Sequence, residues 1–264
     1  MKRVVWLTDI HLNFIKKAQT EELCDKIVEA HPDLVLIGGD ISEADELEAH
    51  LRALEARIER PIYFVLGNHD FYQGSIQSVR ENAAQITQSG GHLRWLPHCG
   101  VVELTQHSAL IGHDCWGDGR LGYGSRSRVI LNDFFLIREL RESPDLFTKL
   151  NCLGEQAAEY FRVHLPGALE RYRHILVLTH VPPFKESCWY EGKISDDEWL
   201  PHFTCHAVGE VLREMMEQHP NSSMTVLCGH THGAGIARIL PNLQVKTGAA
   251  TYGSPKIQEV LCVD

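Results

Sequence analysis

The amino-acid sequence predicts a layered α/β fold. Short runs of apolar and β-branched residues alternate along the chain with longer segments that carry apolar residues at helical spacing. Strands that alternate with helices in this way normally pair in parallel. The 264 residues are enough to bury a substantial core, either as one large domain or as a domain with an appendage.

The first part of the chain repeats a unit of one strand and one helix. Leu23, Ile27 and Ala30 lie on one face of the first helix, and Gly90 and Gly91 end the last one. This alternation is typical of consecutive β–α–β units. The predicted order is strand 4–8, helix 18–30, strand 31–40, helix 45–59, strand 61–70 and helix 75–90.

The remainder of the chain adds short strands and two further helices. Residues 100–104 and 108–114 are expected to form neighbouring strands, and the last three strands of the chain are expected to pair antiparallel. The predicted order after residue 114 is helix 150–169, strand 174–180, helix 206–218, and strands 224–230, 235–240, 243–248 and 257–263.

Residues 115–149 interrupt this rhythm. The segment is rich in Gly, Arg and Ser before a short helix near 132–140. The sequence contains no tandem repeat and no low-complexity tract. We therefore expect a single domain over residues 1–264, with an insertion or cap at about 115–149.

The composition is that of an ordinary soluble globular protein, with 44% hydrophobic and 23% charged residues. No apolar run approaches the length of a membrane span, about 18 residues. The opening "MKRVVWLTDIHLN" becomes polar too early for a secretory signal. We therefore expect a cytoplasmic protein without a membrane partner. The eight cysteines include no C-x-x-C pair, so we expect them to be reduced and to serve mainly in packing.

The charge and the histidine content bear on the possible partners. The formal charge of −10 argues against a broad binding surface for nucleic acid. It is compatible with a local basic pocket. The 16 histidines favour a metal or acid–base site, because histidine is the commonest metal ligand. No pattern indicates the oligomeric state.

Side chains of metal-ligand type directly follow five of the predicted strands. Because the carboxyl ends of parallel strands share one edge of a sheet, these distant segments would converge there. Each residue also has a simpler explanation alone, since Asp and Asn are common at turns and a lone histidine is often a satisfied loop group. Five such strand ends together favour a metal site. The residues are Asp9, His11, Asp40, Asn68, His69, Asp70, His180, His230 and His232.

The ordered motifs D-I-H, G-D, G-N-H-D, T-H and G-H-T-H resemble the complete motif set of the calcineurin-like metallophosphoesterase superfamily. The resemblance spans Asp9 to His232. It implies two facing mixed β-sheets flanked by helices, a four-layer sandwich, with a pair of metal ions at the strand ends. It also implies the ligands: Asp9, His11 and His232 for one ion, Asn68, His180 and His230 for the other, and Asp40 for both.

The resemblance further implies hydrolysis of a phosphate mono- or diester by a bridging hydroxide. Two ions about 3.5–4 Å apart share a carboxylate and a water, and lower the pKa of that water towards neutrality. His69 would act as the acid near the leaving group, with Asp70 orienting it. Gly229 and Gly233 would give the last loop room to turn. Ligands without thiolate suit divalent or trivalent Mn, Fe, Zn or Ni.

The expected partner is a small phosphorylated substrate, with a nucleotide among the candidates. The G-N-H-D motif departs from the G-N-H-E of the Ser/Thr protein phosphatases, which makes that branch less attractive. One alternative is a catalytically weak scaffold or interaction protein of the same fold. Another is a nucleotide-cofactor binder, because residues 117–122 match G-x-G-x-x-G, but no helix is predicted to begin there.

Two further segments are candidates for substrate contact. Arg120, Arg126 and Arg128 could reach an anionic substrate over the metal edge, although arginines of a loop are usually solvated. Residues 188–200 carry two tryptophans and a tyrosine that could form an aromatic wall, although packing of an irregular loop is the simpler interpretation. His113 and Asp114, at the end of another apolar run, are expected to have a structural role.

Overall fold

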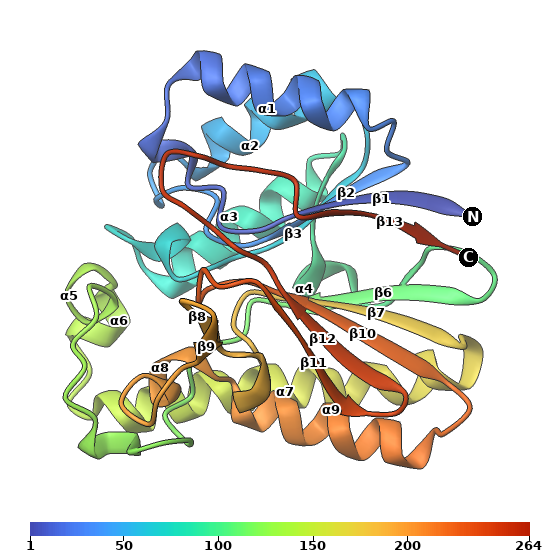
Figure 1. Ribbon diagram of the computed structural model, residues 1–264. Helices are drawn as coiled ribbons and strands as arrows, with labels where there is room; N and C mark the ends of the chain where they lie inside the picture. The colour runs from blue at the N-terminus through green and yellow to red at the C-terminus, as the bar shows by residue number, and fades with distance from the viewer.

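Two β-sheets face each other in the computed structural model, which describes residues 1–264 (Figure 1). The first sheet has the strand order β13-β1-β2-β3-β4. Strands β1 to β4 run parallel, and β13 pairs antiparallel with β1 at the edge. The strands are β1 (Lys2–Leu7), β2 (Leu34–Gly38), β3 (Ile62–Val65), β4 (Leu93–Trp95) and β13 (Glu259–Val263).

The second sheet has the order β11-β12-β10-β7-β6-β5. Its four central strands run parallel, and the two edge strands, β11 and β5, are antiparallel to their neighbours. A separate two-stranded hairpin, β8 and β9, lies in the loop after β7. The strands are β5 (Val102–Glu103), β6 (Ser108–His113), β7 (His174–Thr179), β8 (Trp189–Tyr190), β9 (Lys193–Ile194), β10 (Ser223–Cys228), β11 (Gly235–Leu240) and β12 (Leu243–Thr247).

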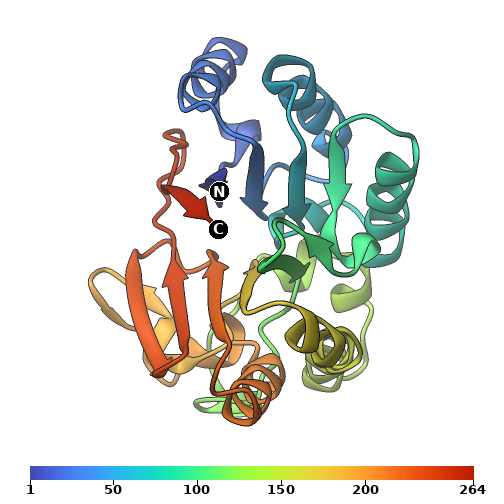
Figure 2. The same cartoon turned by 90° about the vertical axis from the view of Figure 1, so that its right-hand side faces the viewer.

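Helices form the two outer layers of the sandwich. Helices α1 (Lys17–Glu29), α2 (Leu47–Ile58) and α3 (Ile76–Gln88) lie outside the first sheet, and α7 (Leu146–Arg171) and α9 (His206–Gln218) lie outside the second (Figure 2). None of the helices combines the length and apolar character needed to span a bilayer. The shorter helices are α4 (Leu96–Cys99), α5 (Asp133–Leu136), α6 (Arg138–Arg141), α8 (Leu200–Phe203), and the 3-10 turns η1 (Leu12–Phe14), η2 (His69–Phe71), η3 (Gly124–Arg126) and η4 (Lys185–Ser187).

Three apolar layers hold these elements together. In β1, Val4 and Trp6 point into the layer between the two sheets, whereas Val5 and Leu7 point into the layer beneath α1, α2 and α3. A third layer joins the second sheet to α7 and α9. The central strands are buried on both faces, which explains why the sequence shows continuous apolar runs there and not an alternation with polar residues. The two-sheet, helix-flanked α/β architecture implied by the family resemblance is therefore confirmed.

The last three strands depart from the sequence-based expectation. Strands β11 and β12 do pair antiparallel, but β12 also pairs in parallel with β10. The final strand, β13, leaves this group and pairs with β1 in the other sheet, where Leu261 lies opposite Val4. Hydrophobic periodicity identified the strands but carries no information on which sheet each one joins, so the expected closing antiparallel group is wrong.

Residues 115–149 dock against the loop after β3 and the start of α3. The expected single helix near 132–140 is two short helices, α5 and α6, broken at Ile137, which has an extended backbone. The Glu139 carboxylate accepts hydrogen bonds from the Ile76 and Gln77 amides at 2.8 and 3.0 Å, and so caps α3. Helix α7 begins earlier than predicted because the Asp145 side chain accepts from the Thr148 amide.

The buried carboxylate of Asp114 joins several elements at the end of β6. It accepts hydrogen bonds from the Leu66 amide at 2.9 Å, the Trp95 indole at 2.9 Å and Arg80 Nε at 3.1 Å. Replacing Asp114 by Ala leaves these three donors without a partner inside the protein. A buried donor that loses its acceptor is costly, so the structural role expected from the sequence agrees with these contacts.

We expect Asp114→Ala to lower the free energy of unfolding by about 3 kcal/mol, because it breaks a buried, fully bonded charge. Urea unfolding followed by circular dichroism measures the change. The matched control is Asp25→Ala, which removes a carboxylate that pairs with Arg57 at the surface. Equal stability of the two variants would show that Asp114 is not a structural anchor.

Candidate metal centre

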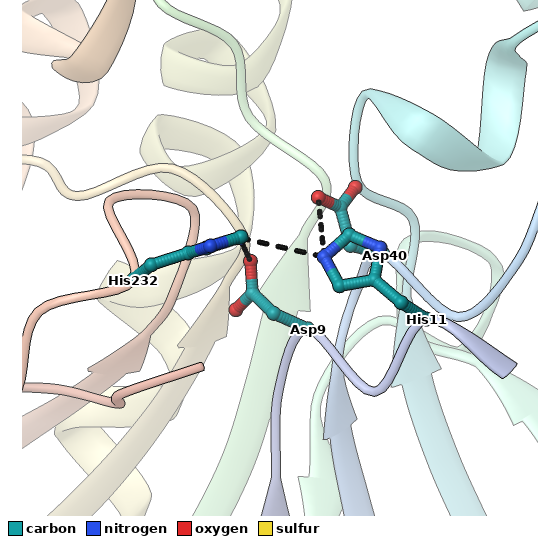
Figure 3. A group of neighbouring side chains, drawn as sticks. All are labelled: Asp9, His11, Asp40 and His232. Carbon is teal, nitrogen blue, oxygen red and sulfur yellow. Dashed lines mark hydrogen bonds and ion pairs between the residues drawn. The ribbon is translucent and has the colours of Figure 1, made fainter. Parts of the chain in front are cut away.

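The loops that leave five parallel strands meet at one end of the sandwich. The first sheet contributes the loops after β1, β2 and β3, and the second sheet contributes those after β7 and β10. Figure 3 shows four of the side chains that these loops bring together. They are Asp9 and His11 from the loop after β1, Asp40 from the loop after β2, and His232 from the loop after β10. The convergence that the sequence predicts at the carboxyl edge is therefore found in the fold.

The first group of ligand-type atoms comes from Asp9, His11, Asp40 and His232. One such atom from each residue lies within 4.8 Å of all the others, and three of the residues are buried. The Nε2 atoms of His11 and His232 are 3.4 Å apart, and His232 Nε2 is 3.4 Å from Asp9 Oδ1. His11 Nε2 is 3.8 Å from Asp40 Oδ2. This spacing is suited to a cation placed between the four side chains.

A second group of three side chains lies beside the first. Asn68 Oδ1 is 3.1 Å from His180 Nε2 and 3.0 Å from His230 Nδ1, and the two ring nitrogens are 3.2 Å apart. Asp40 Oδ1 is 3.4 Å from His180 Nε2, whereas the other Asp40 oxygen faces His11. Asp40 is thus the carboxylate that both groups share.

The outer nitrogens of both rings in the second group are held by backbone carbonyls. His180 Nδ1 donates to Gly38 O at 2.8 Å, and His230 Nε2 donates to His202 O at 3.1 Å. In the neutral ring, the other nitrogen then carries a lone pair and points towards Asn68 Oδ1. Burial lowers the pKa of His230 well below its usual range, which favours this neutral form. Three acceptor atoms that face one another are the donor set that a cation requires.

The amide of Asn68 is oriented by a residue that the sequence does not reveal. Asn68 Nδ2 donates to Asp133 Oδ1 at 3.0 Å and to the Tyr72 hydroxyl at 3.3 Å, so that its oxygen points towards the two histidines. The Tyr72 hydroxyl also donates to Asp133 Oδ1, at 2.6 Å. Asp133 is buried and belongs to segment 115–149. It follows no predicted strand, and only the docking of this segment brings it to the site.

Five of the seven candidate ligands occupy strained backbone conformations. Non-glycine residues rarely adopt a positive φ, and such residues concentrate at functional sites because the surrounding structure must hold them there. Half of the ten non-glycine residues with positive φ belong to these loops. They are Asp9 (50°), His11 (41°), Asp40 (49°), His230 (69°) and His232 (58°).

Glycines let the loops approach the carboxylates closely. A Cβ atom on Gly229 would overlap the Asp9 carboxylate, and one on Gly67 would overlap that of Asp40. A Cβ on Gly233 would meet the backbone of Trp189. The expectation that glycines give the last loop room agrees with these contacts.

His69 lies at the rim of the site and outside both groups. Its ring stacks on Tyr72 with centroids 4.3 Å apart, and its Nε2 is 3.4 Å from the Tyr252 hydroxyl. Its backbone N–H donates to Asp40 Oδ1 at 2.9 Å. Burial lowers the pKa of His69 to about 4, so the imidazole is neutral at neutral pH.

Asp70 acts on the backbone and not on the His69 ring. Its buried carboxylate accepts hydrogen bonds from the amides of Ile41, Ser42 and Gly67, at 2.8, 2.9 and 2.8 Å. It makes no hydrogen bond to the imidazole. Asp70 ties together the loops after β2 and β3, so any orientation of His69 by Asp70 acts through the backbone of the loop after β3.

The pKa values of the Asp9 and Asp40 carboxylates are shifted in opposite directions. Burial alone raises the pKa of Asp9, but its hydrogen bond with His232 and the nearby histidines outweigh this, and the pKa of Asp9 is lowered overall. Burial, together with the charges of Asp9 and Asp70, raises the pKa of Asp40 well above its usual range. A cation next to Asp40 would reverse that shift, because an opposite charge favours the ionised form.

The site opens into a cavity of about 320 Å³ that Asp40, Asn68 and His230 help to line. The arginines considered as substrate contacts do not line it. Arg120 pairs with Glu155 at 2.9 Å and Arg128 with Glu198 at 3.0 Å, while Arg126 is exposed. The idea that they reach over the metal edge is therefore not supported by their positions.

The two other local patterns are also resolved by the fold. Residues 117–122 form a loop that is followed only by the three-residue 3-10 turn η3 and not by an α-helix, and two of their glycines have positive φ, which removes the structural context of a dinucleotide site. Of the aromatic segment 188–200, Tyr190 and Trp199 line the cavity. The suggested aromatic wall is therefore present in part.

A comparison with protein-family models gives one match over most of the chain. The model described as calcineurin-like phosphoesterase matches residues 2–234. The chain belongs to the calcineurin-like phosphoesterase family. In this calcineurin-like phosphoesterase, the matched range contains every candidate ligand, from Asp9 to His232. The family typically uses two divalent metals, and the Asp and His cluster described above could bind them. No curated protein matches the chain in a sequence comparison.

Solved structures of low sequence identity resemble this calcineurin-like phosphoesterase in fold. A phosphopantetheinyl hydrolase from Mycobacterium tuberculosis aligns with a TM-score of 0.67 at 15% identity, over 94% of this chain and 89% of that chain. A dimetal phosphatase from Danio rerio aligns with a TM-score of 0.59 at 15% identity, over 96% and 89%. The anchor in the inner membrane complex of Plasmodium aligns with a TM-score of 0.52 at 14% identity, over 99% and 77%.

Proposed function

We propose that this phosphoesterase hydrolyses a mono- or diester of a small phosphorylated molecule with the help of two metal ions. The observation that carries the proposal is the position of Asp40, whose two oxygens face two separate groups of ligand-type atoms. A shared carboxylate between two such groups is characteristic of two-metal hydrolytic sites. The dimetal phosphatase from Danio rerio, which has a similar fold, supports the same assignment.

The proposed ligands divide between the two groups. When bound, the ions supply a water of lowered pKa as the nucleophile and neutralise the oxygens of the phosphoryl group. The donors are oxygen and nitrogen atoms without thiolate, which suits Mn, Fe, Zn or Ni. Asp9, His11 and His232 would hold one ion, Asn68, His180 and His230 the other, and Asp40 both.

The side chains around the ligands have positioning roles in this proposal. Asp133 and Tyr72 hold the Asn68 amide with its oxygen towards the second group. His69 lines the cavity, and we assign to it a hydrogen bond from its N–H to the leaving oxygen; the negative phosphoryl group would raise the pKa of His69. In the reaction, the oxygen of water would bond to phosphorus, the P–O bond to the organic group would break, and the leaving oxygen would take up a proton equivalent to the one lost by the water, so that the products are a phosphate and an alcohol.

We further propose that the chain is a single domain in which residues 115–149 form a cap over one side of the site. The cap supplies Asp133 and two apolar side chains of the cavity, Ile130 and Leu131. A nucleotide and a phosphopantetheine ester both fit the description of a small phosphorylated substrate. The phosphopantetheinyl hydrolase of similar fold makes the second a reasonable test compound.

We expect the purified protein to contain two metal ions per chain and to hydrolyse an aryl phosphate ester, and this activity should disappear on chelation. Elemental analysis gives the metal content, and a panel of mono- and diesters assayed with Mn gives the activity. Removal and restoration of the metal is the control for chelator damage. A protein without metal or turnover under all conditions would instead support the alternative, a scaffold of the same fold.

A further inference from the structure

The cavity in front of the candidate metal centre is lined by two chemically different sets of residues. One set consists of ligand-type residues, including Asp40 and His230. The other set consists of aromatic and aliphatic residues from the cap, from β8, from α8 and its preceding loop, and from the loop before β13. These side chains include Ile130, Tyr190, Trp199, Phe203 and Tyr252.

A row of rings leads away from the candidate ligand His230. Phe203 meets the His230 ring edge-on, with centroids 5.1 Å apart at 85°. Trp199 stacks on Phe203, with centroids again 5.1 Å apart at 29°. The Trp199 and Tyr190 side chains remain 40% and 47% exposed although they line the cavity. Large aromatic residues that stay accessible beside a site provide apolar contact area for a ligand.

The same cavity offers no cationic side chain to a second anionic group. None of the 15 lining residues is Lys or Arg. Asp133 is among the lining residues, and the chain as a whole carries a formal charge of −10. An anionic group on the organic part of a substrate would lose part of its hydration without gaining a Lys or Arg as a charged partner, which is unfavourable.

We propose that the organic group of the substrate ester is a flat aromatic system that bears no anionic group other than the phosphoryl group being cleaved. This inference rests on the proposed function, because it places the phosphoryl group at the metal centre. The aromatic system then lies against the row formed by Phe203 and Trp199. Polyphosphates, bisphosphates and phosphorylated carboxylic acids are poor substrates on this view.

The test uses three esters that release primary alcohols, so that leaving-group reactivity differs little among them. They are ethyl phosphate, 2-phenylethyl phosphate and 2-(4-carboxyphenyl)ethyl phosphate. The metal-loaded protein is expected to prefer the phenylethyl ester over the ethyl ester by about tenfold in kcat/KM, because a phenyl ring is buried. The added carboxylate is expected to reduce kcat/KM again, by about tenfold.

Two variants assign these preferences to the cavity. Trp199→Ala should lower kcat/KM for the phenylethyl ester by about tenfold and leave that for the ethyl ester within about twofold. Ile130 is 72% exposed, so Ile130→Lys is compatible with folding and places a cation at the cavity. It should improve kcat/KM for the carboxylated ester by about fivefold. The control is Phe135→Ala, since Phe135 is 59% exposed in the same cap but does not line the cavity.

The outcomes separate this inference from the proposed function. Hydrolysis of all three esters at similar kcat/KM, with Trp199→Ala and Ile130→Lys behaving like Phe135→Ala, overturns the aromatic preference and leaves the phosphoesterase assignment intact. Failure of the metal-loaded protein to hydrolyse these three monoesters and every ester of the mono- and diester panel overturns the proposed function, and this inference with it. A loss of the phenyl preference in Trp199→Ala, or a gain for the carboxylated ester in Ile130→Lys, supports the inference.

Discussion

Replacing Asp40 by Asn is expected to reduce kcat/KM by at least about a thousandfold, which corresponds to several kcal/mol of lost transition-state stabilisation. The two Asp40 oxygens face His11 and His180, and hence both proposed ion positions. An amide has one oxygen acceptor and no negative charge, so it cannot serve both. We expect the metal content to fall below two ions per chain. Elemental analysis and steady-state kinetics of the purified variant measure both effects.

The control for Asp40→Asn is Asp45→Asn, which makes the same chemical change at an exposed position of the same loop. It should retain its metal and its activity. An Asp40→Asn variant with full metal content and undiminished turnover would contradict the two-metal proposal. Asp40 also accepts a hydrogen bond from the His69 backbone N–H, which Asp40→Asn could weaken. A thermal melt of both variants therefore shows whether the protein remains folded.

Replacing His69 by Ala is expected to lower kcat by about 10²–10⁴-fold while both metal ions are retained. The His69 ring contacts Tyr72 and Tyr252 at the rim and belongs to neither group of ligand-type atoms. The variant therefore separates proton donation to the leaving group from metal binding. The measurement combines metal analysis with kinetics on two esters whose leaving groups differ in pKa. The loss should be larger for the poorer leaving group.

His92→Ala serves as the comparison for His69→Ala, because it removes an exposed histidine far from the candidate ligands. It should behave like the unmodified protein. Loss of metal from His69→Ala, or equal kcat for His69→Ala and His92→Ala, would show that His69 does not have the proposed role.

The sequence carried most of the information on the position of the site. Each candidate ligand directly follows an apolar run, and parallel strands place their carboxyl ends at one edge, so Asp9, Asp40 and His180 could be brought together without coordinates. The positive φ of Asp9 and Asp40 and the pairing of individual atoms could not be predicted, since these depend on the close approach of loops such as that of Gly67 to Asp40.

The features that the sequence missed depend on contacts between distant segments. Asp133 lies in an irregular segment, and its contact with Asn68 exists because Glu139 and neighbouring backbone groups fasten that segment to the start of α3. Strand β13 has an ordinary strand pattern, but it pairs with β1 of the first sheet, far from it in the sequence. Local periodicity contains neither kind of information.

The distribution of the candidate ligands over both sheets has a consequence for the stability of the protein. Asp9, Asp40 and Asn68 come from one sheet, whereas His180 and His230 come from the other. Ions bound as proposed would act as cross-links between the two halves of the sandwich, in a chain whose eight cysteines are all free. A ligand that binds only the folded state stabilises that state. Metal loading would therefore raise the free energy of unfolding by holding the two sheets together, in addition to preparing the site for catalysis.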